Sequence, residues 1–135
     1  APHTWEEKSK PYPEAPAGLP LVQHGLQILM DFYHKDILSL ETIVEKTSHN
    51  VAKRFQVKDR GFIREGYFAD LAIIDHHKPY QVSKENILYK CGWSPFEGHN
   101  FKSSIFMTII NGNIAFKDGR VIEHLPFGMQ IEFNR

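Results

Sequence analysis

The chain is poor in cysteine. Its 135 residues include a single cysteine, Cys91, which excludes a disulfide within the chain and a zinc site built on several thiolates. No signature of a catalytic thiol surrounds Cys91, so we expect a small, partly buried apolar side chain there. Such sparse use of cysteine favours a reducing compartment and predicts a cytoplasmic protein.

Long apolar runs and an excess of charge of either sign are also absent. The apolar runs fall far short of the roughly 20 residues that cross a bilayer, and we expect neither a membrane span nor a signal peptide. Basic and acidic residues number 16 each, which gives no electrostatic basis for binding nucleic acid. Apolar residues make up 41% of the chain, as is typical of an ordered globular protein.

The first part of the chain predicts a loop followed by helices. Five prolines fall within residues 1–20, a density that neither a helix nor a central strand tolerates. Apolar residues then recur every three or four positions, which predicts an amphipathic helix over about 21–33. Ser39 is a suitable N-cap for a second helix, and a third is expected over about 50–54.

After Phe55 the pattern changes to short strands. Aliphatic and β-branched runs bounded by glycine and charged residues predict strands, and Asn111-Gly112-Asn113 is typical of a hairpin turn. The predicted strands cover residues 61–63, 69–75, 104–110, 114–116 and 121–122. Helices thus precede strands, which indicates two structural layers that meet near Phe55.

Eight histidines raise the question of a metal site. Their spacing matches neither His-x-His nor His-Glu-x-x-His, the patterns typical of zinc ligands. We expect His76 and His77 in a surface turn, and His24 and His34 at exposed or edge positions of the first long helix. Residues 6–7, both glutamate, are expected to be solvated loop charges. These local motifs predict only a cytoplasmic protein of mixed helix and strand with a histidine-containing loop.

Three collinear segments resemble the carboxyl-terminal part of dihydroorotases, and specifically the longer bacterial type. These are cyclic amidohydrolases of pyrimidine biosynthesis. Ala1-Pro2-His3-Thr4 is similar to the end of their motif Asp-His-Ala-Pro-His-Thr, with Ala15-Pro16-Ala17-Gly18 at the family's distance. Residues 47–55 are similar to the family's Asn-Pro-Ala-Lys-x-Phe helix and continue into 61–66 and 69–75. The third segment is Lys90-Cys91-Gly92-Trp93-Ser94-Pro95-Phe96-Glu97-Gly98, followed by 108–112 and 118–119.

The resemblance implies an α/β fold made of two parts. Residues 1–56 would form the last loop and closing helices at the carboxyl-terminal end of a (β/α)8 metal-dependent hydrolase barrel. Residues 57–135 would form part of a flanking β-sandwich. The sequence departs from the family at Val51, where proline is usual, and at Phe68, where a polar residue is usual; both are expected to be structural positions.

The resemblance also implies that this chain supplies only some of the residues of a substrate site. His3 would bind the carboxylate of dihydroorotate, and the main chain of Ala17 and Gly18 would bond to the edge of the pyrimidine ring. Family members use zinc to activate the hydroxide that attacks the ring amide, with an aspartate that carries the proton. No metal ligand and no catalytic residue is expected in this chain, so the chain alone should be inactive. Its implied partners are the small-molecule substrate, dihydroorotate or N-carbamoyl-L-aspartate, and the amino-terminal part of the same protein, with a homodimer left open.

Two alternatives remain at this point. The second and third segments are shared with allantoinases and dihydropyrimidinases, so they indicate the superfamily, whereas His3 favours dihydroorotate. A protein of a different class, a metal-free amidohydrolase-like structural or regulatory protein, also fits the sequence. The residues upstream of Ala1 would discriminate, because Asp-His there and an earlier His-x-His would support the enzyme.

Overall fold

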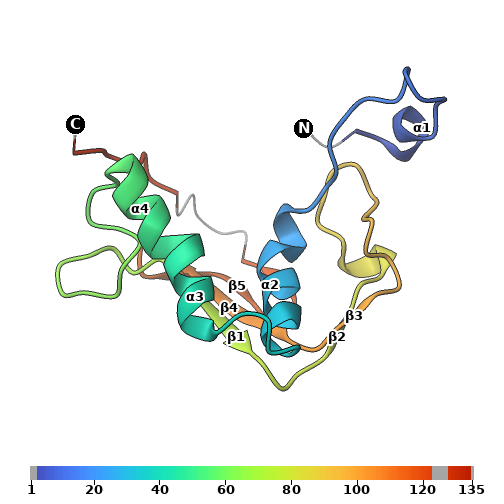
Figure 1. Ribbon diagram of the computed structural model, residues 1–135. Coiled ribbons are helices and arrows are strands. Elements are labelled where there is room, and N and C mark those ends of the chain that lie inside the picture. The colour runs from blue at the N-terminus through green and yellow to red at the C-terminus, as the bar shows by residue number, and fades with distance from the viewer. Residues whose placement is uncertain (1–2, 123–127, 135) are drawn as a thin grey trace. The chain divides into compact units, whose positions relative to one another are not determined.

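The computed structural model describes residues 3–122 and 128–134, and it combines helices and sheet (Figure 1). Two compact units make it up, the first from residues 1–31 and 76–104, the second from 32–75 and 105–135. Within the described residues, no helix has the length and apolar character needed to span a membrane. The mixture of helix and sheet agrees with the predicted class. The division near residue 56 into barrel and sandwich stays a prediction.

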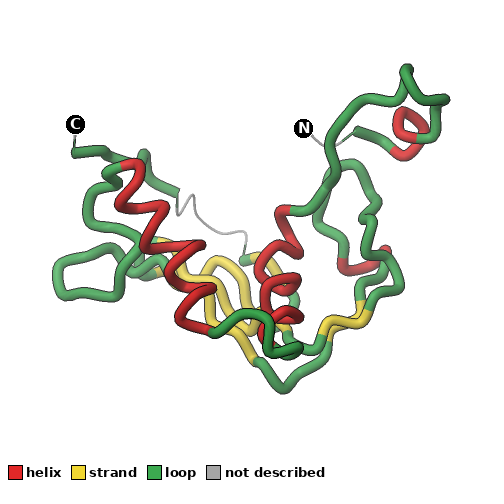
Figure 2. Tube along the Cα trace, in the orientation of Figure 1, coloured by secondary structure: helices red, strands yellow, loops and turns green. Residues whose placement is uncertain are grey.

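Short elements follow one another along the chain, as Figure 2 shows. The helical elements are α1 (Trp5–Lys8), η1 (Val22–His24), α2 (Gly25–Tyr33), α3 (Leu40–Val44), the π-helical turn η2 (Glu45–His49), α4 (Asn50–Phe55) and η3 (Lys84–Asn86). The strands are β1 (Leu71–Asp75), β2 (Tyr80–Gln81), β3 (Asn100–Phe101), β4 (Ser104–Ile110), β5 (Asn113–Lys117) and β6 (Arg120–Val121).

A single helical turn, α1, forms inside the segment predicted to be a loop. The Thr4 hydroxyl accepts the N–H of Glu7 at 3.3 Å, and the N–H of Thr4 donates to the Glu7 carboxylate at 2.9 Å. This reciprocal capping box satisfies two backbone donors at the start of the helix. The helix ends before Pro11, so among the described residues 3–20 the loop prediction is wrong for residues 5–8 only.

The core of the first unit lies between α2 and the antiparallel pair of β2 and β3. In this pair Tyr80 lies opposite Phe101 and Gln81 opposite Asn100. The side chains with at most 2% exposure include His24, Met30, Val82 and Phe101. The unit therefore buries one face of α2 against aromatic and aliphatic side chains from residues 80–101.

The buried face of α2 follows the predicted apolar stripe only in part, since it includes Met30. The predicted helix over 21–33 is confirmed, with its first turn formed by η1. Val22, at the start of the expected apolar stripe, is 93% exposed, whereas His24 and Gln27 are almost fully buried. The prediction of an exposed or edge position is therefore wrong for His24, because a ring of aromatic side chains surrounds it. His34 is half-buried.

In the second unit, residues 40–55 form one continuous helical run. Ser39 caps it as predicted, with its hydroxyl accepting the N–H of Thr42 at 3.2 Å. The two predicted helices are present, but η2 joins them without a break. The run ends at Gln56, which takes a left-handed conformation with φ of 55°.

The four-stranded sheet of the second unit has the order β1-β4-β5-β6. The predicted hairpin is confirmed, since β4 and β5 are antiparallel and Ile110 pairs with Asn113 around a turn. Asn111 and Gly112 both have positive φ, as a tight hairpin turn requires. The predicted strand over 69–75 begins two residues later, at Leu71.

No strand forms over residues 61–63, so that prediction is wrong. Gly61 has φ of +81°, and a Cβ added there would lie 2.5 Å from the Cβ of Ala52 on α4. The chain bends against the helix at this point, and it cannot extend as a strand. A local β propensity in Phe62 and Ile63 is overridden by this close approach.

Arg60 lies in the loop before β1 and links this loop to the turn of the β4–β5 hairpin. Its guanidinium bonds to the Asp70 carboxylate and to the side-chain oxygen of Asn111, the latter at 2.8 Å. Asp70 also accepts the N–H of Asn111 at 2.8 Å. The Phe68 ring lies 4.0 Å from the guanidinium carbon of Arg60, so the aromatic residue at this unusual position supports the network through a cation–π contact.

Candidate functional site

His3, Ala17 and Gly18 all lie in the first unit, on the segment that contains α1. The ring nitrogen Nδ1 of His3 lies 3.2 Å from the Glu7 carboxylate. Capping of α1 holds Glu7 in place for this contact. Glu7 is therefore more than the solvated loop charge expected, because it orients a histidine of the candidate site while its side chain stays about half exposed.

The charge of Glu7 determines which ring nitrogen of His3 can meet a ligand. The N–H of Thr4, followed by His3, lowers the pKa of the Glu7 carboxyl below its usual value, so the group is an anion near neutral pH. An anionic carboxylate accepts the proton on Nδ1. A ligand would then bond to Nε2, and a protonated His3 offers Nε2–H to an anion.

Trp93 fixes the main chain at His3. Its indole N–H donates to the carbonyl oxygen of His3 at 2.7 Å. Trp93 is 8% exposed, and its ring meets that of Trp5 edge to face, with centroids 5.5 Å apart. Sequence reasoning missed this contact, because 90 positions separate the two residues that form it.

Ala17 and Gly18 are both exposed. Gly18 has φ of +99°, and no atom lies within 4 Å of the place where a Cβ would stand. The ammonium group of Lys8 bonds to the carbonyl oxygen of Pro16, so the end of α1 is joined to the residue before this pair. This bond closes residues 8–16 into a loop.

An open pocket of about 440 Å³ adjoins Gly18. Residues 18–23 line one side, and Leu88 and Tyr89 line the other. Gln23 ties the two sides together through three hydrogen bonds. Its N–H donates to the Tyr89 hydroxyl at 2.7 Å, and its side-chain amide donates to the carbonyl of Asn86 at 2.7 Å and accepts the N–H of Leu88 at 2.8 Å.

His24, the residue after Gln23, lies in a cage of aromatic side chains. Its Nδ1 lies 3.4 Å from the Ser94 hydroxyl, and its Nε2 has no hydrogen-bond partner within the described residues. The four surrounding rings have centroids 5.7–6.3 Å from that of His24, and belong to Tyr80, Tyr89, Phe96 and Phe101. Burial lowers the pKa of His24, which keeps this imidazole neutral.

The buried His24 predicts a stability that depends on pH. Because the folded pKa lies below the unfolded value, the unfolded chain binds the proton more readily, and folding stability is full above about pH 6.5 and declines as the pH falls below it. The loss is at most about 1.4 kcal/mol per pH unit. We expect His24→Phe to remove this part of the dependence in denaturant titrations between pH 5 and 7.5.

The matched control for this measurement is His76→Gln. His76 is exposed, as predicted, with its ring 3.9 Å from that of His77. Its replacement should leave the pH dependence of unfolding unchanged. Equal pH profiles for wild type and His24→Phe would contradict the role assigned to the buried imidazole.

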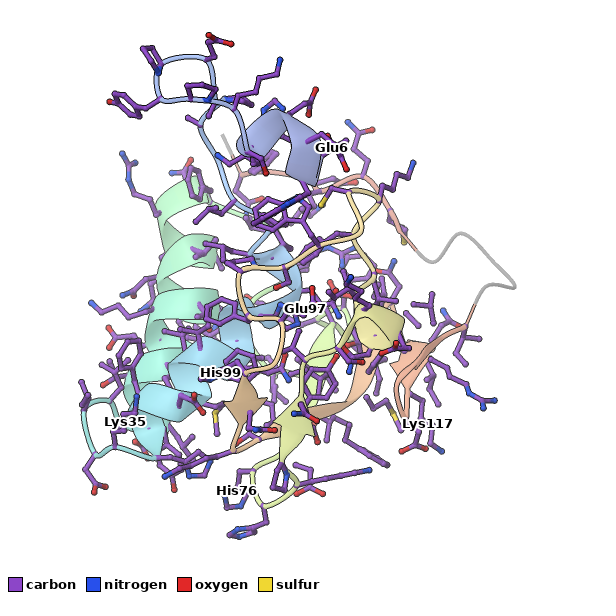
Figure 3. The ribbon with its side chains drawn as sticks, turned by 90° about the vertical axis from the view of Figure 1, so that its right-hand side faces the viewer. Glu6, Lys35, His76, Glu97, His99 and Lys117 are labelled. Atoms are coloured by element: carbon purple, nitrogen blue, oxygen red, sulfur yellow. The ribbon has the colours of Figure 1, made fainter. Side chains whose placement is uncertain are left out.

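Near the carboxyl-terminal end of α2, His99 is paired with Asp31. Its Nε2 lies 3.2 Å from the carboxylate of Asp31, which also accepts the N–H of Lys102 at 3.2 Å. Figure 3 shows His99 and Glu97 on the segment that leads to β3, and Glu6 on α1. These contacts support the end of α2, and none of them involves the predicted site residues.

The side chains of the described residues do not form a metal site. Among these residues, no three histidine, cysteine, aspartate or glutamate side chains lie together in a way that could hold a metal ion. Cys91 is free and half-buried, as expected, and its thiol lies 3.8 Å from the carbonyl of Trp93. The described residues therefore do not fit a zinc centre by themselves.

Comparison with known proteins gives a consistent result. The family model described as the amidohydrolase family matches residues 11–116. The dihydroorotase of Pyrococcus abyssi is 38% identical over 122 residues, which cover 90% of this chain and 29% of that protein. The dihydroorotase of Methanosphaera stadtmanae is 36% identical, over 92% of this chain and 29% of that protein.

Among solved structures, the chain resembles L-hydantoinase (dihydropyrimidinase) from Arthrobacter aurescens. The TM-score is 0.78 at 27% identity, and the match covers 87% of this chain and 27% of the hydantoinase. The chain thus spans less than a third of the length of each of these relatives.

Proposed function

The chain belongs to the amidohydrolase family, and from this premise we propose that it is the carboxyl-terminal part of a dihydroorotase. The enzyme would interconvert dihydroorotate and N-carbamoyl-L-aspartate in pyrimidine biosynthesis. Support comes from dihydroorotases that are 36–38% identical over about nine tenths of the chain. A cytoplasmic location fits such a metabolic role and the single cysteine.

The contact between His3 and Glu7 carries the substrate assignment. Glu7 accepts a hydrogen bond from Nδ1–H, which leaves Nε2 to face a ligand, and an imidazolium at His3 would present Nε2–H to it. Dihydroorotate bears a carboxylate, which would accept this charge-assisted bond. The uncharged cyclic amides dihydrouracil and allantoin have no carboxylate to offer. We assign His3 to the substrate carboxylate for this reason.

Ala17 and Gly18 would contact the edge of the substrate ring through their main chain. Both are exposed, and the space around Gly18 is open. Glycine permits a close approach of ligand and backbone, and its positive φ is a conformation that other residues rarely adopt. Amide and carbonyl groups of the main chain could then pair with the N–H and C=O groups of a pyrimidine ring.

Zinc and the catalytic residues would come from the rest of the protein. Among the described residues no three potential ligands lie together, and by its resemblance to the family this chain would contribute substrate contacts and no metal ligand. Residues 1–56 would complete a (β/α)8 barrel, and residues 57–135 would form part of a β-sandwich. Some apolar side chains of this chain are exposed, such as Val22 at 93% and Ile63 at 88%. Their exposure supports the proposal that the rest of the protein covers them.

Substrate preference in the full-length protein tests this proposal. We expect kcat/KM for dihydroorotate to exceed the values for dihydrouracil and allantoin by at least ~10- to 100-fold, the range expected for one charge-assisted hydrogen bond. The chain alone should show no turnover and no stoichiometric zinc, whereas the full-length protein should contain zinc. Activity would be followed by hydrolysis of each ring, and zinc by elemental analysis.

The structural resemblance to a hydantoinase favours one second candidate. A preference for dihydrouracil in the full-length protein would support a dihydropyrimidinase, and a preference for allantoin an allantoinase. A folded full-length protein that holds no zinc and hydrolyses none of the three would support the structural or regulatory alternative. Any of these three results would overturn the assignment of dihydroorotate.

A further inference from the structure

We propose that Trp93 is a positioning residue for His3, acting through the His3 carbonyl, so that a residue far along the chain determines how the site binds the substrate carboxylate. The inference rests on the proposed function, because it takes His3 as the carboxylate-binding residue. It adds a residue that touches neither the substrate nor the metal.

The geometry at Trp93 supports a specific contact. A buried indole N–H needs an acceptor, and the His3 carbonyl supplies it at 2.7 Å. The ring of Trp5 packs edge to face on Trp93, and this ring contact does not involve the indole N–H that bonds to His3. His3 is thereby held at two points, its main chain by Trp93 and its imidazole by Glu7.

Trp93 is itself held from both sides of its segment. On the amino-terminal side, the three bonds of Gln23 fix residues 86–89. On the carboxyl-terminal side, Ser94 is buried, contacts His24 and accepts the N–H of Phe96 at 3.2 Å. The indole N–H of Trp93 is therefore carried by a segment that other contacts hold in place, so its bond can restrict the movement of His3 in the exposed loop.

Loss of this donor should weaken binding of the carboxylate without changing the chemical step. A small displacement of a binding group can reduce catalysis strongly, and a contact made equally in ground and transition states appears in KM. We expect Trp93→Phe to raise KM for dihydroorotate by about 5- to 10-fold, the range for one neutral hydrogen bond. The kcat, and KM for dihydrouracil where that ring is turned over, should stay within about twofold of wild type.

Trp5→Phe is the matched control in the full-length enzyme. It makes the same change from indole to phenyl in the same aromatic pair but keeps the bond from Trp93 to His3. We expect its KM for dihydroorotate to equal that of the wild type. Equal increases in KM for both variants would show a general packing effect and would overturn the positioning role.

A background of His3→Ala separates this inference from the proposed function. If Trp93 acts through His3, Trp93→Phe should cause no further rise in KM when His3 is already alanine. A rise with His3→Ala and none with Trp93→Phe would overturn the role of Trp93 alone. An unchanged KM with His3→Ala would overturn the role of His3, and with it both proposals.

An NMR measurement on the unsubstituted side chain covers the case in which Trp93→Phe fails to fold. In full-length enzyme labelled with ¹⁵N-tryptophan, the indole N–H signal of Trp93 should shift when N-carbamoyl-L-aspartate is added. The signal should not shift in His3→Ala. The inference would be overturned if the ligand did not shift the indole signal of Trp93 in the wild type, or if it shifted this signal equally in both proteins.

Discussion

Replacing His3 by alanine in the full-length enzyme is expected to lower kcat/KM for dihydroorotate by about 10- to 100-fold. The substitution removes the imidazole that Glu7 orients through a 3.2 Å contact, and hydrogen bonds to charged groups are worth roughly 1.5–3 kcal/mol. Most of the effect should appear as a higher KM, because the carboxylate does not react and is bound in the ground state too. Steady-state kinetics over a range of substrate concentrations measures it.

Glu7→Gln provides the graded control for this result. Glutamine keeps an oxygen that can accept the Nδ1 proton and the N–H of Thr4, but it lacks the negative charge. We expect a smaller loss, about 2- to 10-fold in kcat/KM. His3→Ala should have no comparable effect on an uncharged ring such as dihydrouracil. Equal losses on charged and uncharged substrates would contradict a carboxylate-binding role for His3.

Replacing Gly61 by alanine is expected to destabilise the second unit by about 2–5 kcal/mol. A positive φ of +81° costs an L-residue roughly 1–2 kcal/mol. The added Cβ would also lie 2.5 Å from the Cβ of Ala52 and 3.1 Å from the carbonyl oxygen of Ser48, and such overpacking costs roughly 1–3 kcal/mol. Denaturant unfolding of the full-length protein, with hydrogen exchange to locate the change, measures the loss.

Gly66→Ala separates the two causes. Gly66 has nearly the same φ, +79°, but no atom lies within 4 Å of its added Cβ. Its replacement should therefore cost only the backbone part, about 1–2 kcal/mol. If the two variants lose equal stability, the close approach of Gly61 to α4 contributes nothing, and the explanation given for the missing strand over 61–63 is wrong.

The parts of the fold that sequence predicted well are those governed by neighbours in the chain. Ser39 caps its helix, and the Asn111-Gly112 turn forms its hairpin, because these residues act within a few positions of themselves. The joining of α3 and α4 by a π-helical turn was missed, since the sequence predicted a separate helix beginning at about residue 50. Residues 61–63 were mispredicted because Ala52 on α4, nine positions before Gly61, determines the backbone there.

The candidate site shows the same limit. His3, Ala17 and Gly18 came from a resemblance to a family, and their roles stay predictions. Glu7 could have been found from the sequence, because Thr4 and Glu7 have the spacing of a capping box that brings the carboxylate toward His3. Trp93 and the cage around His24 could not, since each depends on contacts about 55–90 positions apart.

The interleaving of the two units has a consequence for synthesis. The first unit needs residues 76–104 to complete it, and the whole of 32–75 lies between its two pieces. On the ribosome, the amino-terminal loop and α2 therefore emerge long before Trp93 and Phe101 are available to them. Contacts of such high sequence separation form slowly, and until then the apolar side chains of α2 are exposed to chaperones and to aggregation.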